Sequence, residues 1–234
     1  MNPTLVLFDI DGTLVDTAGA GRLGLQEAFR SVFGLVDIEG PVSRVRFDGK
    51  TDPTIISDIG REAGISPGSV EARYAELQEA YLQALRKELC VPNPRRRALP
   101  GVRPLLDLLT ARPDIFLGLV TGNVEEGARV KLDAFDLNRH FVDGGFASDH
   151  PERNEIARIA HEKLSRRAGF RFPADRVMVI GDTELDILCA RSNGFRSLAV
   201  ASGGVPRERL EAAGPDTFLP DLRNAAAVLA AMGL

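Results

Sequence analysis

Four short apolar runs stand out along the chain, and a polar or glycine-containing stretch follows each of them. They cover residues 4–9, 115–122, 176–182 and 196–203. The runs are rich in Val, Ile and Leu and do not alternate with polar residues, which is typical of parallel strands covered on both faces. Helical patterns lie between the last three runs, in EEGARVKLDAF, NEIARIAHEKLSRRAG and TELDILCARSNG. This alternation predicts an α/β fold with a doubly wound parallel sheet.

The segment 17–98 departs from that alternation. Helical patterns cover about 21–33, 53–63 and 67–89, and the connections FDGKTDP and GISPG separate them. The only strand candidate is VSRVRF, at 42–47. We therefore expect a helical insert at 17–98, within an α/β core formed by 1–16 and 99–234.

Composition narrows the class of protein. Lys and Arg number 29 and Asp and Glu 33, a net charge of −4 that gives no reason to expect nucleic acid or an anionic membrane as partner. The two cysteines, Cys90 and Cys189, lie far apart and outside any CxxC spacing, so we expect no disulfide framework and no zinc site. No signal-peptide pattern and no apolar window of membrane-spanning length occurs. We expect a cytoplasmic protein.

Acidic residues gather where the predicted strands end. Asp9 and Asp11 follow the first strand, Thr121 ends the second, and Asp182 and Asp186 follow the third. Parallel sheets present their sites at the carboxyl ends of strands, so these side chains should crowd one region. Clustered carboxylates cost free energy unless a cation compensates them, and hard oxygen ligands suit Mg²⁺. The sequence therefore predicts a magnesium site.

The motifs DIDGT, TGN and GDTELD, each after an apolar strand, resemble those of the haloacid dehalogenase superfamily, specifically its phosphoglycolate-phosphatase-like members. The resemblance implies that Asp9 is the nucleophile and forms an aspartyl phosphate. It implies that Asp11 is the general acid and then the base, and that its backbone carbonyl binds Mg²⁺. The second carboxylate also argues against the metal-free dehalogenases, which typically lack it.

The same resemblance assigns roles beyond the first strand. Thr121 would hydrogen-bond the transferring phosphoryl group, and Gly122 and Asn123 would bring backbone donors close to it. Asp182 would join Asp9 as a direct metal ligand, and Asp186 would hold metal-bound waters.

The chain departs from the family in its phosphate-binding cation. The family usually has a Lys before the last core helix, where this chain has SDHPERNEIARIAHEKL. Two substitutes remain open, with Lys131 the preferred phosphate contact and Arg153 the second. Arg153 begins that helix and has a long reach. Lys131 lies on the helix after TGN, and its side chain should lean toward the helix start over the small residues Ala128 and Gly127.

The insert resembles the helical cap of the superfamily's first cap type, and FDGKTDP resembles its specificity loop. Lys50 in this loop is a candidate ligand for a substrate carboxylate or phosphate. The stretch TAGAGRLG, residues 17–24, is rich in small residues. Within it, Gly19, Ala20 and Gly21 are expected to form the hinge into the cap and to leave room for substrate, and Arg22 is a weaker candidate for the cleft.

The leading prediction is a Mg²⁺-dependent phosphatase for a small phosphorylated metabolite, such as phosphoglycolate or a sugar phosphate, acting as a monomer or homodimer. Two other enzymes remain open: a phosphonoacetaldehyde hydrolase that uses Lys50 as a Schiff base, and a phosphosugar mutase. The non-enzymatic alternative is a regulatory binding protein on a decayed phosphatase scaffold.

Overall fold

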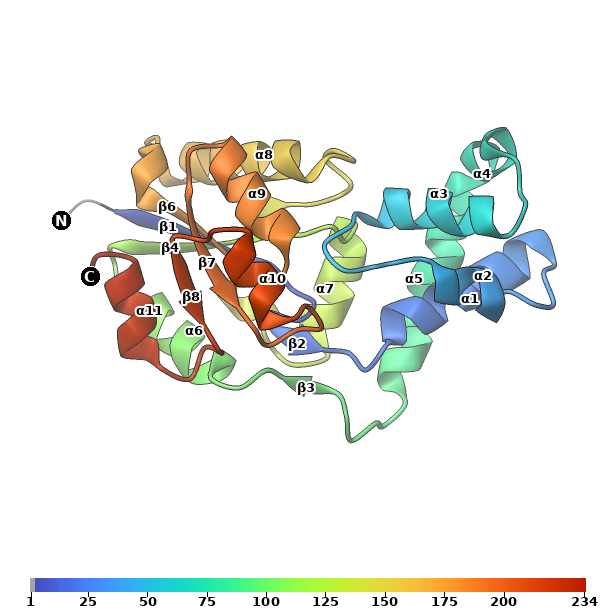
Figure 1. The fold of residues 1–234 in the computed structure, drawn as a ribbon, viewed down its shortest axis with the longest axis horizontal. Coiled ribbons are helices and arrows are strands. Elements are labelled where there is room, and N and C mark those ends of the chain that lie inside the picture. Colours follow the sequence, from blue (N-terminus) through green and yellow to red (C-terminus); the bar gives the residue numbers. More distant parts are fainter. Residues whose placement is uncertain (1–2) are drawn as a thin grey trace.

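A six-stranded parallel sheet forms the centre of the computed structural model, which describes residues 3–234. The strand order is β5-β4-β1-β6-β7-β8. The strands are β1 (Thr4–Phe8), β4 (Ile115–Val120), β5 (Gly144–Gly145), β6 (Val177–Gly181), β7 (Arg196–Val200) and β8 (Thr217–Leu219). The helices that follow them pack on both faces of the sheet (Figure 1). This architecture confirms the predicted α/β fold class.

Alternate residues of the central strand pack against different helices. Leu5 and Leu7 belong to the same buried cluster as residues of α8 (Arg153–Ala168) and α9 (Glu184–Ser192). Val6 and Phe8 belong to the cluster that contains residues of α6 (Val102–Thr110) and α11 (Ala225–Ala231). Both faces of β1 are therefore apolar, which is why its sequence shows no alternation with polar residues. The remaining core helices are α7 (Glu125–Asp133) and α10 (Arg207–Ala212), with short 3₁₀ turns at Asn138–His140 and Ala174–Arg176.

Five helices form the segment that we call the cap. They are α1 (Ala20–Phe33), α2 (Glu39–Arg44), α3 (Asp52–Glu62), α4 (Pro67–Ala72) and α5 (Tyr74–Cys90). Figure 1 shows them grouped beyond the carboxyl ends of the parallel strands, with α1 and α5 packed together. The cap therefore faces the edge of the sheet at which the acidic motifs lie.

Two details of the predicted cap are wrong. The candidate strand at 42–47 is not a strand, because α2 extends to Arg44. Ile38 and Val42 are both fully buried and stand four residues apart, which is helical spacing. The predicted helix over 67–89 is two helices, interrupted at Arg73, whose guanidinium lies over the Phe33 ring and donates to the Val32 carbonyl.

A small antiparallel ladder joins the cap to the core. It consists of β2 (Val15–Asp16) and β3 (Arg97–Ala98), with Val15 opposite Ala98 and Asp16 opposite Arg97. The expected boundaries of the insert, after residue 16 and before residue 99, fall at this ladder. None of the helices within residues 3–234 has the length and apolar character that crossing a bilayer requires.

Candidate active site

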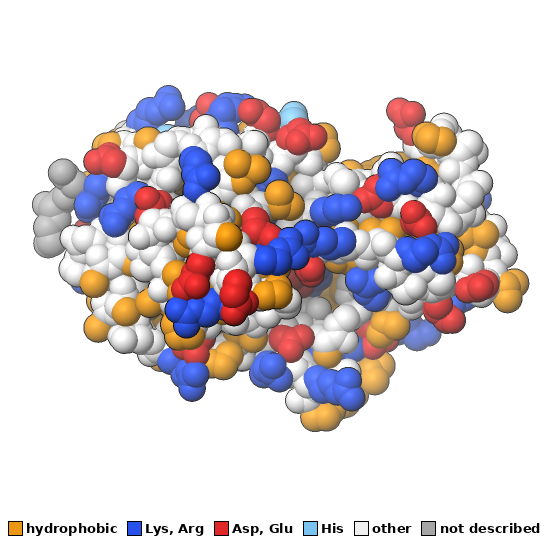
Figure 2. Space-filling model, in the orientation of Figure 1, with side chains coloured by type: hydrophobic (Ala, Val, Ile, Leu, Met, Phe, Trp, Pro, Cys, Tyr) orange, Lys and Arg blue, Asp and Glu red, His pale blue; other side chains and the backbone are white. Residues whose placement is uncertain are grey.

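A cavity of about 490 Å³ lies between the carboxyl ends of the strands and the cap. Core residues, including Asp9, Thr121 and Asp182, line one side, and cap residues, including Arg22 and Tyr81, line another. Figure 2 shows Lys and Arg side chains, interspersed with acidic ones, around the hollow between the two parts of the molecule. The cavity brings together most of the residues that the sequence motifs single out.

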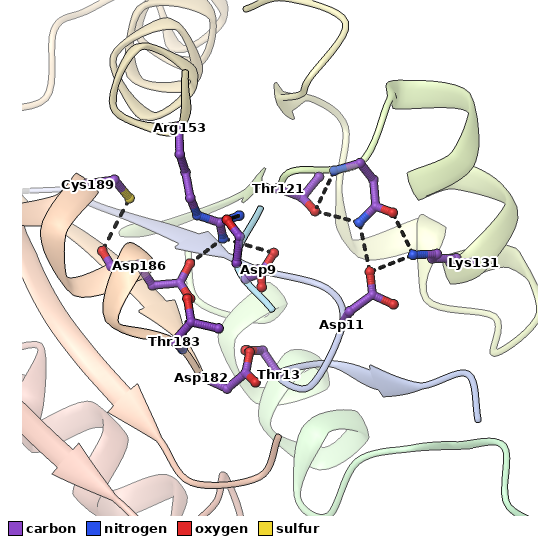
Figure 3. Close-up of polar contacts among 12 residues, drawn as sticks. Asp9, Asp11, Thr13, Thr121, Lys131, Arg153, Asp182, Thr183, Asp186 and Cys189 are labelled. Atoms are coloured by element: carbon purple, nitrogen blue, oxygen red, sulfur yellow. Dashed lines mark hydrogen bonds and ion pairs between the residues drawn. The ribbon is translucent and has the colours of Figure 1, made fainter. Parts of the chain in front are cut away.

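Three buried carboxylates form a cluster at the floor of the site. Asp9, Asp182 and Asp186 each place one oxygen within 4.8 Å of the others. Asp9 and Asp182 meet because β1 and β6 are paired parallel neighbours, and Asp186 comes from the first turn of α9 (Figure 3). Burial raises the pKa of Asp9 to about 6, with Arg153 opposing the shift, and burial next to Asp9 raises the pKa of Asp182 well above its ordinary value.

The cluster fits a hard cation. Asp182 accepts a hydrogen bond from the Thr13 hydroxyl at 3.2 Å on Oδ1, whereas its Oδ2 accepts none from residues 3–234. Two glycines leave room for this carboxylate. A Cβ at Gly203 would lie 1.7 Å from Oδ2, and one at Gly12 would lie 2.3 Å from it. Carboxylate oxygens of this kind are the hard donors that Mg²⁺ prefers, and the remaining positions around such an ion are usually filled by water.

Asp186 differs from the other two carboxylates in that both of its oxygens are engaged. Oδ2 accepts the Thr183 backbone N–H at 3.0 Å and the Thr183 hydroxyl at 2.6 Å, which caps α9. Oδ1 accepts from the Arg153 guanidinium. These contacts hold Asp186 at the border of the cluster and suit its predicted place behind the direct ligands.

A second polar group lies on the other side of Asp9, around Asp11. The Lys131 ammonium donates to Asp11 Oδ2 at 2.6 Å and to Asn123 Oδ1 at 2.6 Å. Asn123 Nδ2 donates to the same Asp11 oxygen at 2.9 Å and to the Thr121 hydroxyl at 2.8 Å. The Asp11 carboxylate therefore points away from the acidic cluster and is fixed by an amide and a buried cation (Figure 3).

Both candidate cations lie in the site, and each contacts a different aspartate. Lys131 contacts Asp11, as described above, and its side chain does lean toward the helix start. Arg153 is 8% exposed, and its Nη2 lies 3.2 Å from Asp9 Oδ1. The arginine therefore supplies the positive charge beside Asp9, and the lysine orients Asp11.

The loop before α3 packs directly against the core. The Asp52 backbone N–H donates to the Gly122 carbonyl at 2.7 Å, and its carboxylate accepts the Val124 N–H at 2.9 Å. A Cβ at Gly122 would lie only 2.2 Å from the Lys50 carbonyl oxygen. Sequence reasoning missed Asp52, because an acid before a proline looks like an ordinary helix start.

Lys50 lines the cavity, but its ammonium is engaged elsewhere. Its Nζ lies 2.6 Å from Asp58 Oδ2, and Arg61 binds the other oxygen of Asp58. Arg22 also lines the cavity, with its guanidinium 4.0 Å from the Phe47 ring centre and bound to the Val42 carbonyl at 2.6 Å. No carboxylate in residues 3–234 forms an ion pair with Arg22. Asp48 acts on Arg22 only through space, without a direct ion pair, so Arg22 is better placed than Lys50 to bind a ligand anion.

Comparisons with known proteins agree with this arrangement. A family model described as haloacid dehalogenase-like hydrolase matches residues 3–194. A phosphoglycolate phosphatase of Synechococcus elongatus is 30% identical over 217 residues, which cover 92% of this chain and 91% of that protein. A probable phosphatase, IndB, of Dickeya dadantii is 30% identical over 227 residues, which cover 92% of this chain and 90% of that protein.

Solved structures support the fold. A predicted phosphatase from Clostridium acetobutylicum superposes with a TM-score of 0.74 at 20% identity, over 98% of this chain and 100% of that one. CbbY from Rhodobacter sphaeroides, in complex with phosphate, superposes with a TM-score of 0.73 at 19% identity, over 99% of this chain and 100% of that one. The family match and the two relatives, together with the acidic motifs, show that the chain belongs to the haloacid dehalogenase-like hydrolase family.

Proposed function

We propose that the protein is a Mg²⁺-dependent phosphatase that hydrolyses a small phosphorylated metabolite through an aspartyl phosphate. Membership of a hydrolase family and the phosphatase names of the relatives at 30% identity support this activity. The observation that carries the proposal is that the two motif carboxylates, Asp9 and Asp11, have different surroundings. Asp9 is buried among acids beside a guanidinium, whereas Asp11 stands apart on the cavity wall and is held by Lys131.

In the first step, an Asp9 oxygen attacks phosphorus and the bond from phosphorus to the leaving oxygen breaks. Asp11 gives its proton to that oxygen. Thr121 and the Arg153 guanidinium lie where they can bind the phosphoryl oxygens. A Mg²⁺ ion held by Asp9, Asp182 and the Asp11 carbonyl would neutralise part of the charge on the phosphoryl group.

In the second step, water attacks the phosphorus of the aspartyl phosphate and loses a proton to Asp11. The bond between phosphorus and Asp9 breaks, inorganic phosphate leaves, and both carboxylates return to their initial states. Asn123 and Lys131 keep the Asp11 carboxylate oriented through both proton transfers, since they bind the same oxygen of it.

The cavity wall favours a leaving group that carries negative charge. Arg22 is half-buried and lines the cavity, and no acidic side chain in the described chain neutralises it by direct contact. A carboxylate on the leaving group, as in phosphoglycolate, would supply the missing counter-charge. Sugar phosphates, with hydroxyl groups only, would use this position less well.

The Schiff-base alternative fits the site poorly. A lysine must lose its proton before its amine can attack an aldehyde, and the contact between Lys50 and Asp58 stabilises the charged ammonium. Borohydride trapping with phosphonoacetaldehyde should therefore leave no adduct on Lys50. A phosphosugar mutase would instead return the phosphoryl group to a sugar rather than to water.

Hydrolysis of p-nitrophenyl phosphate, with and without Mg²⁺, tests the proposal. We expect metal-dependent turnover by the wild type and a loss of at least about 10³-fold in Asp9→Asn, which keeps the shape of the side chain but removes the nucleophile. Equal inertness of both proteins with Mg²⁺ present would favour the binding-protein alternative. A screen of 2-phosphoglycolate and hexose phosphates would then rank the substrates.

A further inference from the structure

Tyr81 presents a hydroxyl without a protein partner to the active-site cavity. The residue lies on cap helix α5, is 1% exposed and lines the cavity. Its hydroxyl has no hydrogen-bond partner anywhere in residues 3–234. Because Tyr81 lines the cavity and no group in residues 3–234 bonds to its hydroxyl, that hydroxyl is free to donate to a bound ligand.

Gly24 makes room for this side chain, and Gly21 and Gly127 border it. A Cβ at Gly24 would lie 3.2 Å from the Tyr81 ring, and one at Gly127 would lie 3.7 Å from it. A Cβ at Gly21 would lie 3.6 Å from the hydroxyl. Gly21 and Gly24 belong to α1 and Gly127 to α7, so the ring spans the junction of cap and core.

The hydroxyl lies on the leaving-group side of the site. A Cβ at Gly21, which would lie next to the Tyr81 hydroxyl, would also lie 3.5 Å from the Lys131 ammonium. Lys131 in turn binds Asp11. Since the proposed mechanism gives Asp11 the proton transfer to the leaving oxygen, a group beside Lys131 faces the substrate near its ester bond. The other two acids of the cluster, Asp182 and Asp186, lie on the opposite side of Asp9, toward the phosphoryl group.

Tyr81 acts in this place as a donor. Burial, together with the charges of Asp52 and Asp11, raises the pKa of Tyr81 well above its ordinary value. The phenol therefore keeps its proton and offers an O–H to an oxygen of the substrate.

We infer that Tyr81 is a specificity-determining residue that donates a hydrogen bond to an oxygen on the leaving group, close to the ester bond. The inference rests on the proposed phosphatase function. It assigns the substrate to esters that carry a carboxylate or hydroxyl on the carbons next to the ester oxygen, and it excludes simple alkyl phosphates as good substrates.

Tyr81→Phe, which removes only the hydroxyl, tests the inference with two pairs of probes. In each pair an oxygen-bearing ester is compared with an alkyl ester of similar length: 2-phosphoglycolate with ethyl phosphate, and glycerol 3-phosphate with propyl phosphate. The matched control is Tyr74→Phe. Tyr74 is the other tyrosine of the chain, lies on the same helix, is half-buried and does not line the cavity.

We expect Tyr81→Phe to lower kcat/KM about 10-fold for at least one oxygen-bearing ester and less than about 2-fold for its alkyl partner, as loss of one hydrogen bond to a polar or charged group predicts. Tyr74→Phe should change neither. Equal losses on both members of each pair, or no loss on any, would overturn the inference, as would a wild type with no preference for the oxygen-bearing esters. Complete inertness of the wild type, including toward p-nitrophenyl phosphate, would instead refute the phosphatase function.

Discussion

Asp52 should reduce the stability of the protein at neutral pH, although it forms a good hydrogen bond. The residue is 6% exposed, and its carboxylate accepts the Val124 N–H at the start of α7. Burial raises the pKa of Asp52 from 3.8 to about 6, and the neighbouring Lys131 and the Val124 hydrogen bond only partly oppose the shift. Asp52→Asn keeps an oxygen that can accept this hydrogen bond and removes the buried charge.

The pKa values give the size of the effect. Because the folded protein binds this proton more tightly than the unfolded chain does, the ionised carboxylate lowers stability as the pH rises from 3.8 through 6. The difference corresponds to about 3 kcal/mol at pH 7.5, about 2 kcal/mol at pH 5 and less than about 1 kcal/mol at pH 4. Asp52→Asn should therefore be the more stable protein at pH 7.5, and its advantage should shrink as the solution becomes acidic.

Urea unfolding of both proteins between pH 4 and pH 7.5 measures this difference. Other titrating groups cancel in the comparison, because both proteins contain them. Asp175→Asn, at an exposed position, is the control and should change the free energy of unfolding only slightly. The reasoning is wrong if Asp52→Asn is less stable than the wild type at pH 7.5, since the charge would then stabilise the start of α7 more than its burial costs.

Three further results are expected. Gly122→Ala places a methyl group 2.2 Å from the Lys50 carbonyl oxygen, so the cap loop must move and KM should rise about 10-fold in steady-state assays; an unchanged KM would show that the loop need not dock there. Mg²⁺ should raise the Tm by several degrees and EDTA should reverse this, because the ion binds only the folded acidic cluster; a Tm indifferent to both would argue against a metal site. Arg153→Met leaves buried carboxylates without their cation and should lower the free energy of unfolding by about 3–5 kcal/mol in EDTA, measured with urea; a loss below about 1 kcal/mol would mean that the ion pair contributes little.

The parts of the site that follow strand ends could be predicted from the sequence. An apolar run followed by an acid identifies Asp9 and Asp182, and parallel pairing of β1 with β6 necessarily brings their ends together. The lean of helical side chains toward the helix start places Lys131 near Asn123, eight residues earlier. These predictions need only local periodicity and the geometry of parallel sheets.

The parts that depend on contacts between cap and core could not be predicted in this way. Asp52 acts on Val124, and Tyr81 packs against Gly127, so in each case the partner lies in a distant segment. Tyr81 has the spacing of an ordinary apolar helix position, and nothing in the local sequence distinguishes a core ring from one that reaches a cavity. Lys50 illustrates the converse: the loop suggested a ligand, but its ammonium is bound to Asp58.

The ladder between β2 and β3 allows the cap to be exchanged as one segment. Since Val15 lies opposite Ala98, the chain departs from the core and returns to it at adjacent points. A foreign segment with other helices can be grafted across these two points without changing the register of β1 with its neighbours. Tyr81 and Arg22 lie inside the exchanged segment, whereas Asp9, Asp11 and Asp182 lie outside it. Recombination at these two points would thus give a new substrate preference to the same core acids, provided that the new segment replaces the contact of Asp52 with the start of α7.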